Sequence, residues 1–328
     1  AVLGGIQGKV NALGHAMGTA LKVGALAGGA AVIGLGVALF KVGASFDAAA
    51  DKIRVGTGAT GDALKRLTAD FKVVFKAVPT DMASASTAIT ELNKRLQLTG
   101  QPLQHLAAQF VELSRITGTD LRSNITTVTR VFGDWSIATE DQSEALNTLF
   151  KISQATGPSV DEIGRLVVQY GAPLRQFGFS FEEAAVMMGQ FQKQGVNTEL
   201  VMGSLRIAIG KFAEENIPLR QGLEDTIRKI QEMGPSARAT ALAMEVFGAR
   251  AGADMADTIL AGKFAIDDWV KSVEGSSESI LQAGKDTMDF GERFTLMKNK
   301  VMVALAPLAG AIFELANVLM DALTPAIE

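Results

Sequence analysis

The segment Leu113-Ser-Arg-Ile-Thr-Gly118 recurs further along the chain as Ile152-Ser-Gln-Ala-Thr-Gly157. Both copies end in a Thr-Gly pair, and glycine is a common helix stop because it adopts a left-handed conformation at no steric cost. Thr60-Gly61 and Thr99-Gly100 show the same offset as the two longer copies. A fixed period, here about 39 residues, is typical of stacked helical pairs. We therefore predict an all-α fold with an array of stacked helical hairpins.

Predicted helix breaks continue this pattern on both sides of the repeated segment. Their successive spacings alternate between about 18 and about 21 residues, as expected for two helix-plus-turn lengths that alternate along the chain. Glycine and proline end helices in every kind of protein, so a chance alignment of ordinary helix stops is the alternative explanation. The predicted breaks are Gly61, Pro79, Gly100, Gly118, Thr139, Gly157 and Gly178.

Three predicted helix starts have the spacing of a capping box. In this motif a hydroxyl accepts a hydrogen bond from the backbone of the third helical residue, whose polar side chain accepts one in return from the capping residue's backbone N–H. We expect helices to begin at Thr139-Glu-Asp-Gln142, Ser159-Val-Asp-Glu162 and Ser180-Phe-Glu-Glu183.

The composition predicts a folded protein with a hydrophobic core, and it does not indicate binding to a charged ligand. Hydrophobic residues make up 48% of 328 residues and charged residues 20%, which provides ample material for a core. The net charge of −4 is too small to indicate binding to nucleic acid or an anionic membrane through charge. The absence of cysteine excludes disulfides, thiolate metal sites and cysteine nucleophiles.

Candidate chemical motifs are weak. Gly56-Thr-Gly58-Ala-Thr-Gly61 matches a dinucleotide fingerprint, but the residues before it have a helical pattern where that fingerprint needs a strand. His15 and His105 have no partner at metal-ligand spacing. Adjacent carboxylates such as Glu182 and Glu183 point in different directions on a helix, so they do not converge on a substrate. We predict no cofactor, no metal and no enzymatic activity.

The longest uncharged run extends from Val23 to Phe40. At about 18 residues it just reaches the length of a membrane span. Small residues at four-residue spacing favour close helix packing. Three interpretations remain open: packing within a protein assembly, insertion in lipid, or the core of a signal peptide. The candidate packing or membrane-facing residues are Gly14, Gly18, Gly24, Gly28, Gly29, Ile33, Leu35 and Phe40.

Four segments are predicted along the chain: an Ala/Gly-rich apolar helical segment (1–45), a helical-hairpin core (46–216), short helices and loops (217–262) and a C-terminal helical segment (263–328). Phe294 to Met320 is apolar nearly all round, although Pro307 and Glu314 interrupt it. A helix of this kind is usually buried by partners, and self-association is the simplest source of them. Because residue 1 is alanine, we expect the chain to be a segment of a longer protein.

With these residues in view, the chain resembles the conserved region of phage tail tape-measure proteins. In that family an Ala/Gly-rich helix leads into a Ser-Phe-Asp helix and a Thr-Gly-Ala-Thr segment. Further matching turns and helix starts follow in order along most of the middle of the chain. The matching stretches are Ala44-Ser-Phe-Asp47, Thr57-Gly-Ala-Thr60, Thr156-Gly-Pro-Ser159, Tyr170-Gly-Ala-Pro-Leu174, Phe177-Gly-Phe-Ser180, Gln194-Gly-Val196 and Phe247-Gly-Ala-Arg-Ala-Gly252.

The resemblance implies a structural protein inside the tail tube or tail tip that sets tail length and is released toward the host envelope during genome injection. It also implies several parallel copies and contacts with tail-tube and tail-tip proteins. We expect three copies, a number that the sequence does not fix. No specific nucleic-acid binding is predicted. The long uninterrupted heptad run expected of the ruler part is missing, so we expect the ruler elsewhere. The alternative function is a membrane-active pore or channel former that uses the glycine-rich apolar helix.

Overall fold

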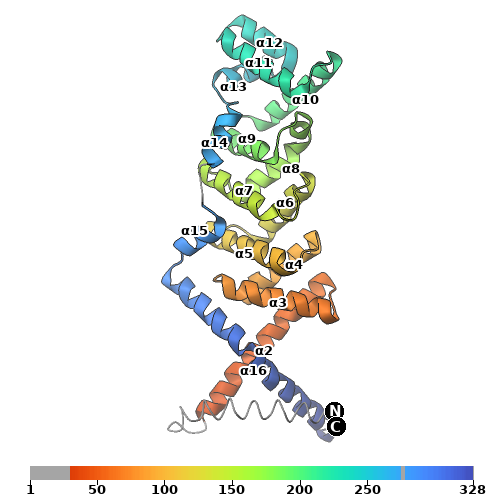
Figure 1. Ribbon diagram of the computed structural model, residues 1–328, viewed down its shortest axis with the longest axis vertical. Coiled ribbons are helices and arrows are strands. Elements are labelled where there is room, and N and C mark those ends of the chain that lie inside the picture. Colours follow the sequence, from red (N-terminus) through yellow and green to blue (C-terminus); the bar gives the residue numbers. More distant parts are fainter. Residues whose placement is uncertain (1–29, 275–277, 328) are drawn as a thin grey trace. The chain divides into compact units, whose positions relative to one another are not determined.

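The computed structural model describes the backbone of residues 30–274 and 278–327, and it describes side chains there except for residues 30–37, 267, 274 and 312–327. Every regular element in this part of the chain is an α-helix (Figure 1). The predicted all-α class is confirmed.

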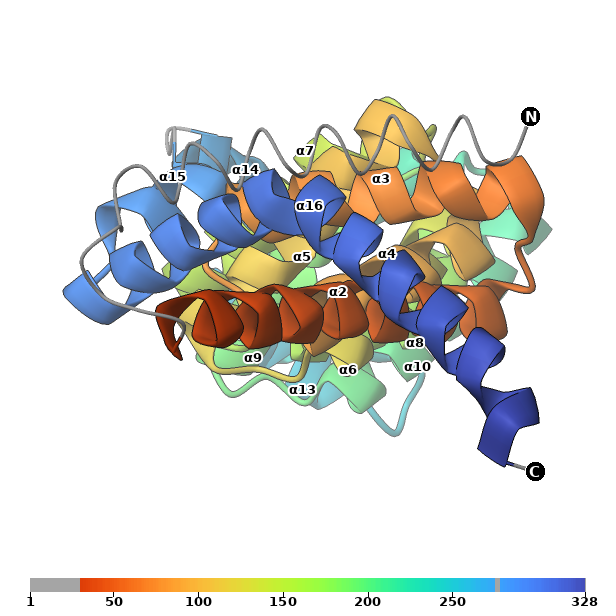
Figure 2. The same ribbon diagram turned by 90° about the horizontal axis from the view of Figure 1, so that it is seen from below.

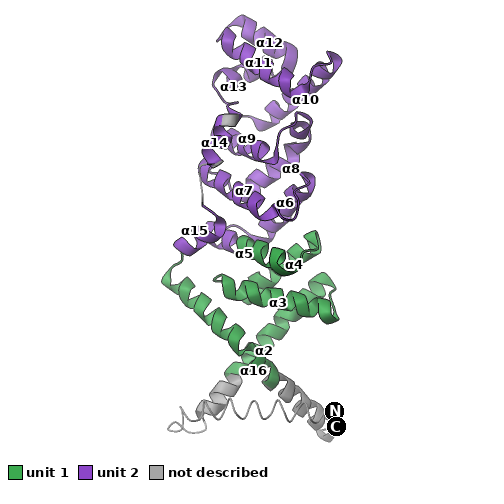
Figure 3. Ribbon diagram, viewed as in Figure 1, with its two compact units in different colours: residues 1–111, 288–328 green, residues 112–287 purple. Residues whose placement is uncertain are grey.

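The described helices belong to two compact units (Figure 3). One unit contains residues 30–111 and 288–327, and the other contains residues 112–287. The division falls inside one helix, α5 (Gly100–Thr117). The four segments predicted from the sequence have different boundaries, and they stay a prediction.

The first unit is organised around two long helices that pack against each other, α2 (Ala30–Thr57) and α16 (Phe290–Ile327), which cross in both views (Figures 1 and 2). Helices α3 (Gly61–Ala77) and α4 (Met82–Leu96) both pack on α2, and α3 also packs on α16. Pro307 lies within α16 and does not end it.

Three phenylalanines form the centre of this unit. The ring of Phe46 on α2 lies 6.0 Å from that of Phe71 and 6.1 Å from that of Phe75, both on α3. All three side chains are buried. The Ser-Phe-Asp motif therefore supplies a core residue, and edge-to-face ring contacts add to the area that Phe46 removes from water.

The second unit is a stack in which most helices contact both the next helix and the one after it. Helix α6 packs on α8, α7 on α9, α8 on α10, α10 on α12 and α11 on α13. The helices of this stack are α6 (Leu121–Asp134), α7 (Gln142–Thr156), α8 (Val160–Gln176), α9 (Phe181–Lys193), α10 (Thr198–Glu214), α11 (Leu219–Met233), α12 (Ala237–Phe247) and α13 (Gly252–Leu260).

The predicted period reappears in the positions where helices begin. Four pairs of alternate helices, α3 and α5, α4 and α6, α6 and α8, and α7 and α9, share one offset between their first residues, the period of about 39 residues. The pair α5 and α7 has a slightly larger offset, because the long helix α5 and the long connection between α6 and α7 both lie within it. Contacts between alternate helices and a near-constant spacing are both typical of stacked helical hairpins.

All seven predicted breaks lie at junctions between helices. The five glycines among them have positive φ, the left-handed region that favours glycine. Two of the three predicted capping boxes are also confirmed, because Ser159 with Glu162 and Ser180 with Glu183 each make both reciprocal bonds.

The third predicted capping box is wrong. The residues after Thr139 form a turn, and α7 begins only at Gln142, preceded by Asp141, whose side chain makes no capping bond. Because Asp141 has a helical φ of −94° and ψ of −13°, its backbone lacks the extended conformation that lets a side chain reach forward to the first amides.

After α13 the chain passes back along the stack. Helix α14 (Ile266–Glu274) packs on α9 and α7. The ring of Phe191 on α9 lies 5.5 Å from that of Phe264 and 6.4 Å from that of Trp269. A short helix, α15 (Ile280–Asp286), follows within the same unit. Trp269 is thus part of the packing between elements far apart in the sequence.

Candidate assembly surface

The structure reaches only part of the predicted glycine-rich site. Gly14, Gly18, Gly24, Gly28 and Gly29 lie outside the described residues. Ile33 and Leu35 belong to α2, but their side chains are not among those described. Phe40 is 39% exposed on α2, whereas its neighbour Leu39 is buried.

The most exposed apolar surface in the first unit is a row of four large side chains on α16, here called the α16 stripe. Phe290, Phe294, Met297 and Val301 are 85%, 55%, 54% and 51% exposed. Their positions are four, three and four apart, so they follow one face of the helix. Exposed apolar residues scattered singly are ordinary, but a continuous row marks a surface that needs a partner.

The opposite face of α16 is already packed. Asn299 is buried and its side-chain amide donates a hydrogen bond to the carbonyl oxygen of Thr80 over 2.7 Å. Ala309 is also buried. This face borders a cleft of about 550 Å³ whose lining includes Lys52 and Asp81. The Lys52 ammonium donates to the Ala83 carbonyl over 3.0 Å, so it helps to join α2 to the start of α4.

The sequence thus predicted that the C-terminal helix is apolar on several sides, and the structure shows which side is used within the unit. The α16 stripe is the side left exposed. The spacing of four, three and four is present in the sequence at Phe290, Phe294, Met297 and Val301. The sequence alone does not distinguish this row from the other apolar residues of the same helix. Only the packing of Asn299 and Ala309 distinguishes the two faces.

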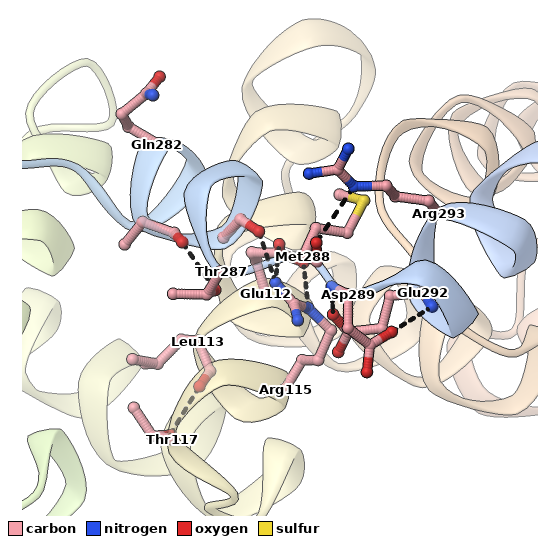
Figure 4. A network of polar contacts seen from close by, with 12 residues as sticks. Glu112, Leu113, Arg115, Thr117, Gln282, Thr287, Met288, Asp289, Glu292 and Arg293 are labelled. Carbon is pink, nitrogen blue, oxygen red and sulfur yellow. Dashed lines mark hydrogen bonds and ion pairs between the residues drawn. The ribbon is translucent and has the colours of Figure 1, made fainter.

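Helix α16 begins with a capping arrangement that was not predicted from the sequence. The Asp289 carboxylate accepts a hydrogen bond from the Glu292 backbone over 2.8 Å, and the Glu292 carboxylate accepts one from the Asp289 backbone over 2.9 Å (Figure 4). The Asp-x-x-Glu spacing could have identified it. This arrangement fixes the start of the helix at the point where the stripe begins.

A buried ion pair anchors α15 in the second unit. The Glu112 carboxylate is almost fully buried and pairs with the Arg115 guanidinium over 2.7 Å, while Arg115 also donates to the Gly284 carbonyl over 2.7 Å (Figure 4). A side chain at Gly284 would overlap the Glu112 carboxylate, so α15 approaches the end of α5 closely because this position is glycine. No local signal in the sequence indicates this contact between distant residues.

A second polar cluster joins α9 to α11. The Arg220 guanidinium pairs with Glu183 over 2.8 Å and lies 4.4 Å from the centre of the Phe179 ring. Burial alone would raise the pKa of Glu183, but hydrogen bonds from Arg220 and from the Ser180 backbone, with the charge of Arg220, hold it below its ordinary value. The hydrogen bond to Glu183 likewise raises the pKa of Arg220.

The motifs that carry the tail-protein resemblance have structural roles in this unit. Gly157, Gly178 and Gly195 each have positive φ at a helix end. Phe177 and Phe179 are buried. A side chain at Gly252 would overlap the Met244 backbone, so this motif sets the close approach of α13 to α12. These residues shape turns and core contacts.

The described part of the chain contains no candidate for two other kinds of site. No group of three or more His, Asp or Glu side chains there is arranged to hold a metal ion. Among the same residues, no helix combines the length and apolar character needed to cross a membrane. Of the run from Val23 to Phe40, residues 23–29 lie outside that part.

Comparison with known proteins identifies the central region. Residues 98–248, a little under half of the chain, match the family of phage-related minor tail proteins. No curated protein and no solved structure matches the chain. The match includes the repeated segments and most of the motifs described above, and it confirms the resemblance to tail proteins. Residues 98–248 are therefore similar to phage-related minor tail proteins, which supports a structural role in a phage tail.

Proposed function

We propose that this chain is the conserved helical region of a tail tape-measure protein. The observation that carries the proposal is the match to minor tail proteins over residues 98–248 on a stack of helices with near-constant spacing. The resemblance adds the finer role, which is assembly inside the tail tube or tail tip, a contribution to tail length and release toward the host envelope at injection.

The proposed role is non-catalytic. The motif residues form turns and core contacts, as at Gly178 and Phe179, which supports a protein that works by assembly. The α16 stripe supports association with copies of itself or with other tail proteins, because exposed rows of large apolar side chains need a partner. Purified protein should leave cell-wall substrate intact in zymography, and clearing that depends on the chain would contradict this part of the proposal.

Tail length is the direct test of the tape-measure role. The test uses in-frame deletions in the part of the gene that encodes the ruler, so that residues 98–248 stay intact. Each deleted residue should shorten the tail by about 1.5 Å, the rise of an extended helix. Electron microscopy of the resulting particles measures this length. Unchanged length over a series of deletions would overturn the tape-measure role.

A matched control separates length from assembly. The substitution Gly203→Ala lies at an open position on α10, where a new side chain meets nothing. Particles with this substitution should assemble with tails of ordinary length. If they instead show shortened tails, the tail-length measurement reports damaged assembly, and the deletion series no longer supports a ruler.

A further inference from the structure

We propose that the α16 stripe binds an acidic amphipathic helix of a different protein, one with an apolar row at heptad spacing and carboxylates along both edges of that row. This interface deepens the association part of the proposed function and rests on that part alone. The match with minor tail proteins ends before α16, so it assigns neither this surface nor the chemistry of a partner.

The stripe has the width of a seam between two helices. Phe290, Phe294, Met297 and Val301 follow one another at intervals of four, three and four, which are the intervals of a coiled-coil seam. Ala304, at the next seam position, is also exposed. An apolar row confined to seam positions is narrower than the face with which an amphipathic helix usually covers a core. The stripe therefore fits a single partner helix.

The charged residues beside this seam are all cations. In a coiled coil, heptad positions e and g flank the seam, and their charges set the choice of partner. Between residues 290 and 301 these flanking positions are Gly291, Arg293, Lys298 and Lys300. The three charged side chains are exposed, and the Arg293 Nε donates a hydrogen bond to the Met288 carbonyl over 3.1 Å (Figure 4). The stripe is thus an apolar row with a cationic edge on each side.

The acidic residues at the start of α16 do not neutralise these edges. Asp289 and Glu292 lie off positions e and g, and each carboxylate accepts a capping hydrogen bond from the backbone of the other residue (Figure 4). Lys298 and Lys300 make no ion pair within the described part of the chain. Carboxylates on a partner helix would complement both edges.

The same edges disfavour pairing with the stripe of a second copy. In a parallel pair in register, position g of one helix lies beside position e of the next heptad of the other, so Arg293 would lie beside the partner's Lys298. In an antiparallel pair each edge faces its own equivalent, and cations again meet cations. Like charges placed together suppress the wrong partner. The stripe therefore selects a helix of different charge.

The described residues of the second unit do not offer such a helix. Asp and Glu outnumber Lys and Arg in that unit, whereas the reverse holds for the described residues of the first unit. Acidic charge alone is not sufficient, because the partner also needs an exposed apolar row. The large apolar side chains exposed among the described residues of the second unit are Ile207, Met233 and Met244, on three different helices. We therefore assign the partner helix to another protein.

An anionic membrane shares the charge complementarity but fits the shape of the stripe less well. Binding of a helix to a lipid surface grows with the apolar area that it buries. The exposed row from Phe290 to Val301 follows one line of seam positions, and Asn299 on the opposite face is already buried within the unit. Vesicle binding is measured below as the competing outcome.

The first experiment measures binding of the full chain to two labelled synthetic helices by fluorescence anisotropy. Both peptides have about four heptads with Leu at the seam positions, and one has Glu while the other has Lys at every e and g position. We expect the acidic peptide to bind at least about tenfold more tightly at low salt, because carboxylates then face all three cations. Added salt should reduce this difference. Binding of neither peptide, or equal binding of both, would overturn the proposal.

The second experiment exchanges the charges on the chain. Lys298→Glu combined with Lys300→Glu should reverse the preference, so that the basic peptide binds more tightly. The control, Lys65→Glu combined with Lys94→Glu, makes the same change in net charge at exposed side chains of α3 and α4. It should keep the preference for the acidic peptide. A preference that follows net charge in both variants would contradict the assignment to α16.

The third experiment tests the apolar row itself. Phe294→Gln should weaken binding of the acidic peptide by at least about tenfold, because a polar amide replaces a seam residue. Its thermal unfolding should change little, since Phe294 is exposed. Val55→Gln, at a side chain 80% exposed on α2, is the matched control and should bind like the parent. Undiminished binding by Phe294→Gln would remove the stripe from the interface.

Two further measurements separate the competing occupants. Sedimentation equilibrium should give the same mass for the parent chain and for Phe294→Gln, and self-association that this substitution abolishes would show that the stripe pairs with another copy. Flotation with vesicles of phosphatidylglycerol and phosphatidylcholine should also be the same for both. Flotation that depends on Phe294 would overturn the protein partner in favour of lipid. None of these results bears on the dependence of tail length on deletions, so the tape-measure role and this interface fail or survive separately.

Discussion

Helices α9 and α16 use their apolar residues in opposite ways. In α9 every residue from Ala184 to Phe191 is buried, because α7, α8, α10 and α14 all pack against it. In α16 only Asn299 and Ala309 are buried among the side chains described, and its packing comes from α2 and α3. Helix α9 therefore buries its apolar residues within this chain, whereas α16 leaves a row of large apolar side chains exposed for a partner.

The largest expected effect comes from a substitution that disturbs the packing of α13 against α12 in the helical stack. Gly252→Ala should lower the free energy of unfolding by about 3 kcal/mol, because the new methyl group overlaps the backbone of α12 and neither helix can yield easily. Urea denaturation of both proteins, with an unchanged m-value, measures the difference. A loss below about 1 kcal/mol would show that α12 and α13 can separate at little cost.

The two faces of α16 should respond differently to substitution. Asn299→Ala should cost about 2 kcal/mol, because it leaves the buried Thr80 carbonyl without its donor. Met297→Gln, on the stripe, should change the stability of the monomer by less than about 0.5 kcal/mol. Both are measured by thermal unfolding at a concentration too low for association. Equal effects would mean that the faces do not differ as described.

A smaller effect tests the cap of α9. Glu183→Gln keeps the capping geometry but removes the charge paired with Arg220, so we expect a loss of about 1 kcal/mol in urea denaturation at pH 7. Glu162→Gln makes the same change in the capping box of α8, where the contacts of Glu162 are those of the cap, and should cost less than about 0.5 kcal/mol. Equal losses of stability in Glu183→Gln and Glu162→Gln would show that the ion pair with Arg220 does not stabilise α9.

The pH dependence of the Glu183 effect follows from its pKa. The folded pKa lies below the ordinary value of 4.5, so the stabilisation from the charged form is complete above 4.5 and is lost as pH falls through the lower folded value. The difference between the parent and Glu183→Gln, measured by urea denaturation from pH 7 to pH 3, should therefore shrink only at the acid end. A difference that grows on acidification would contradict the assignment.

The smallest effect has the opposite sign. Gly203→Ala lies within α10, where a new side chain meets no neighbour, so it should raise stability by about 0.5–1 kcal/mol through the better helix propensity of alanine. Thermal unfolding of this variant beside Gly252→Ala compares an open glycine with an enclosed one. Destabilisation would show that the surroundings of α10 are tighter than described.

Local signals in the sequence predicted much of the architecture. Each predicted break falls at a helix junction, and both Ser-x-x-Glu boxes at Ser159 and Ser180 form. These features depend on a few neighbouring residues, so they can be recognised without the fold. The failure at Thr139 has the same origin, because the spacing was present while the backbone at Asp141 stayed helical.

Local sequence patterns did not predict the contacts between distant parts of the chain. No residue near Glu112 or Gly284 indicates that these two residues are in contact. The sequence around Trp269 likewise does not indicate that its ring packs against that of Phe191. The same holds for the α16 stripe, since the sequence shows an apolar helix but not which face other elements already cover.

The sequence by itself determined the helical class, the positions of the turns and the resemblance to tail proteins, because glycine conformation, capping and apolar periodicity act over a few residues. Only the tertiary structure decided which apolar side chains are left for a partner. Burial depends on every element that packs against a face, and for α16 those elements, α2 and α3, come from the opposite end of the sequence.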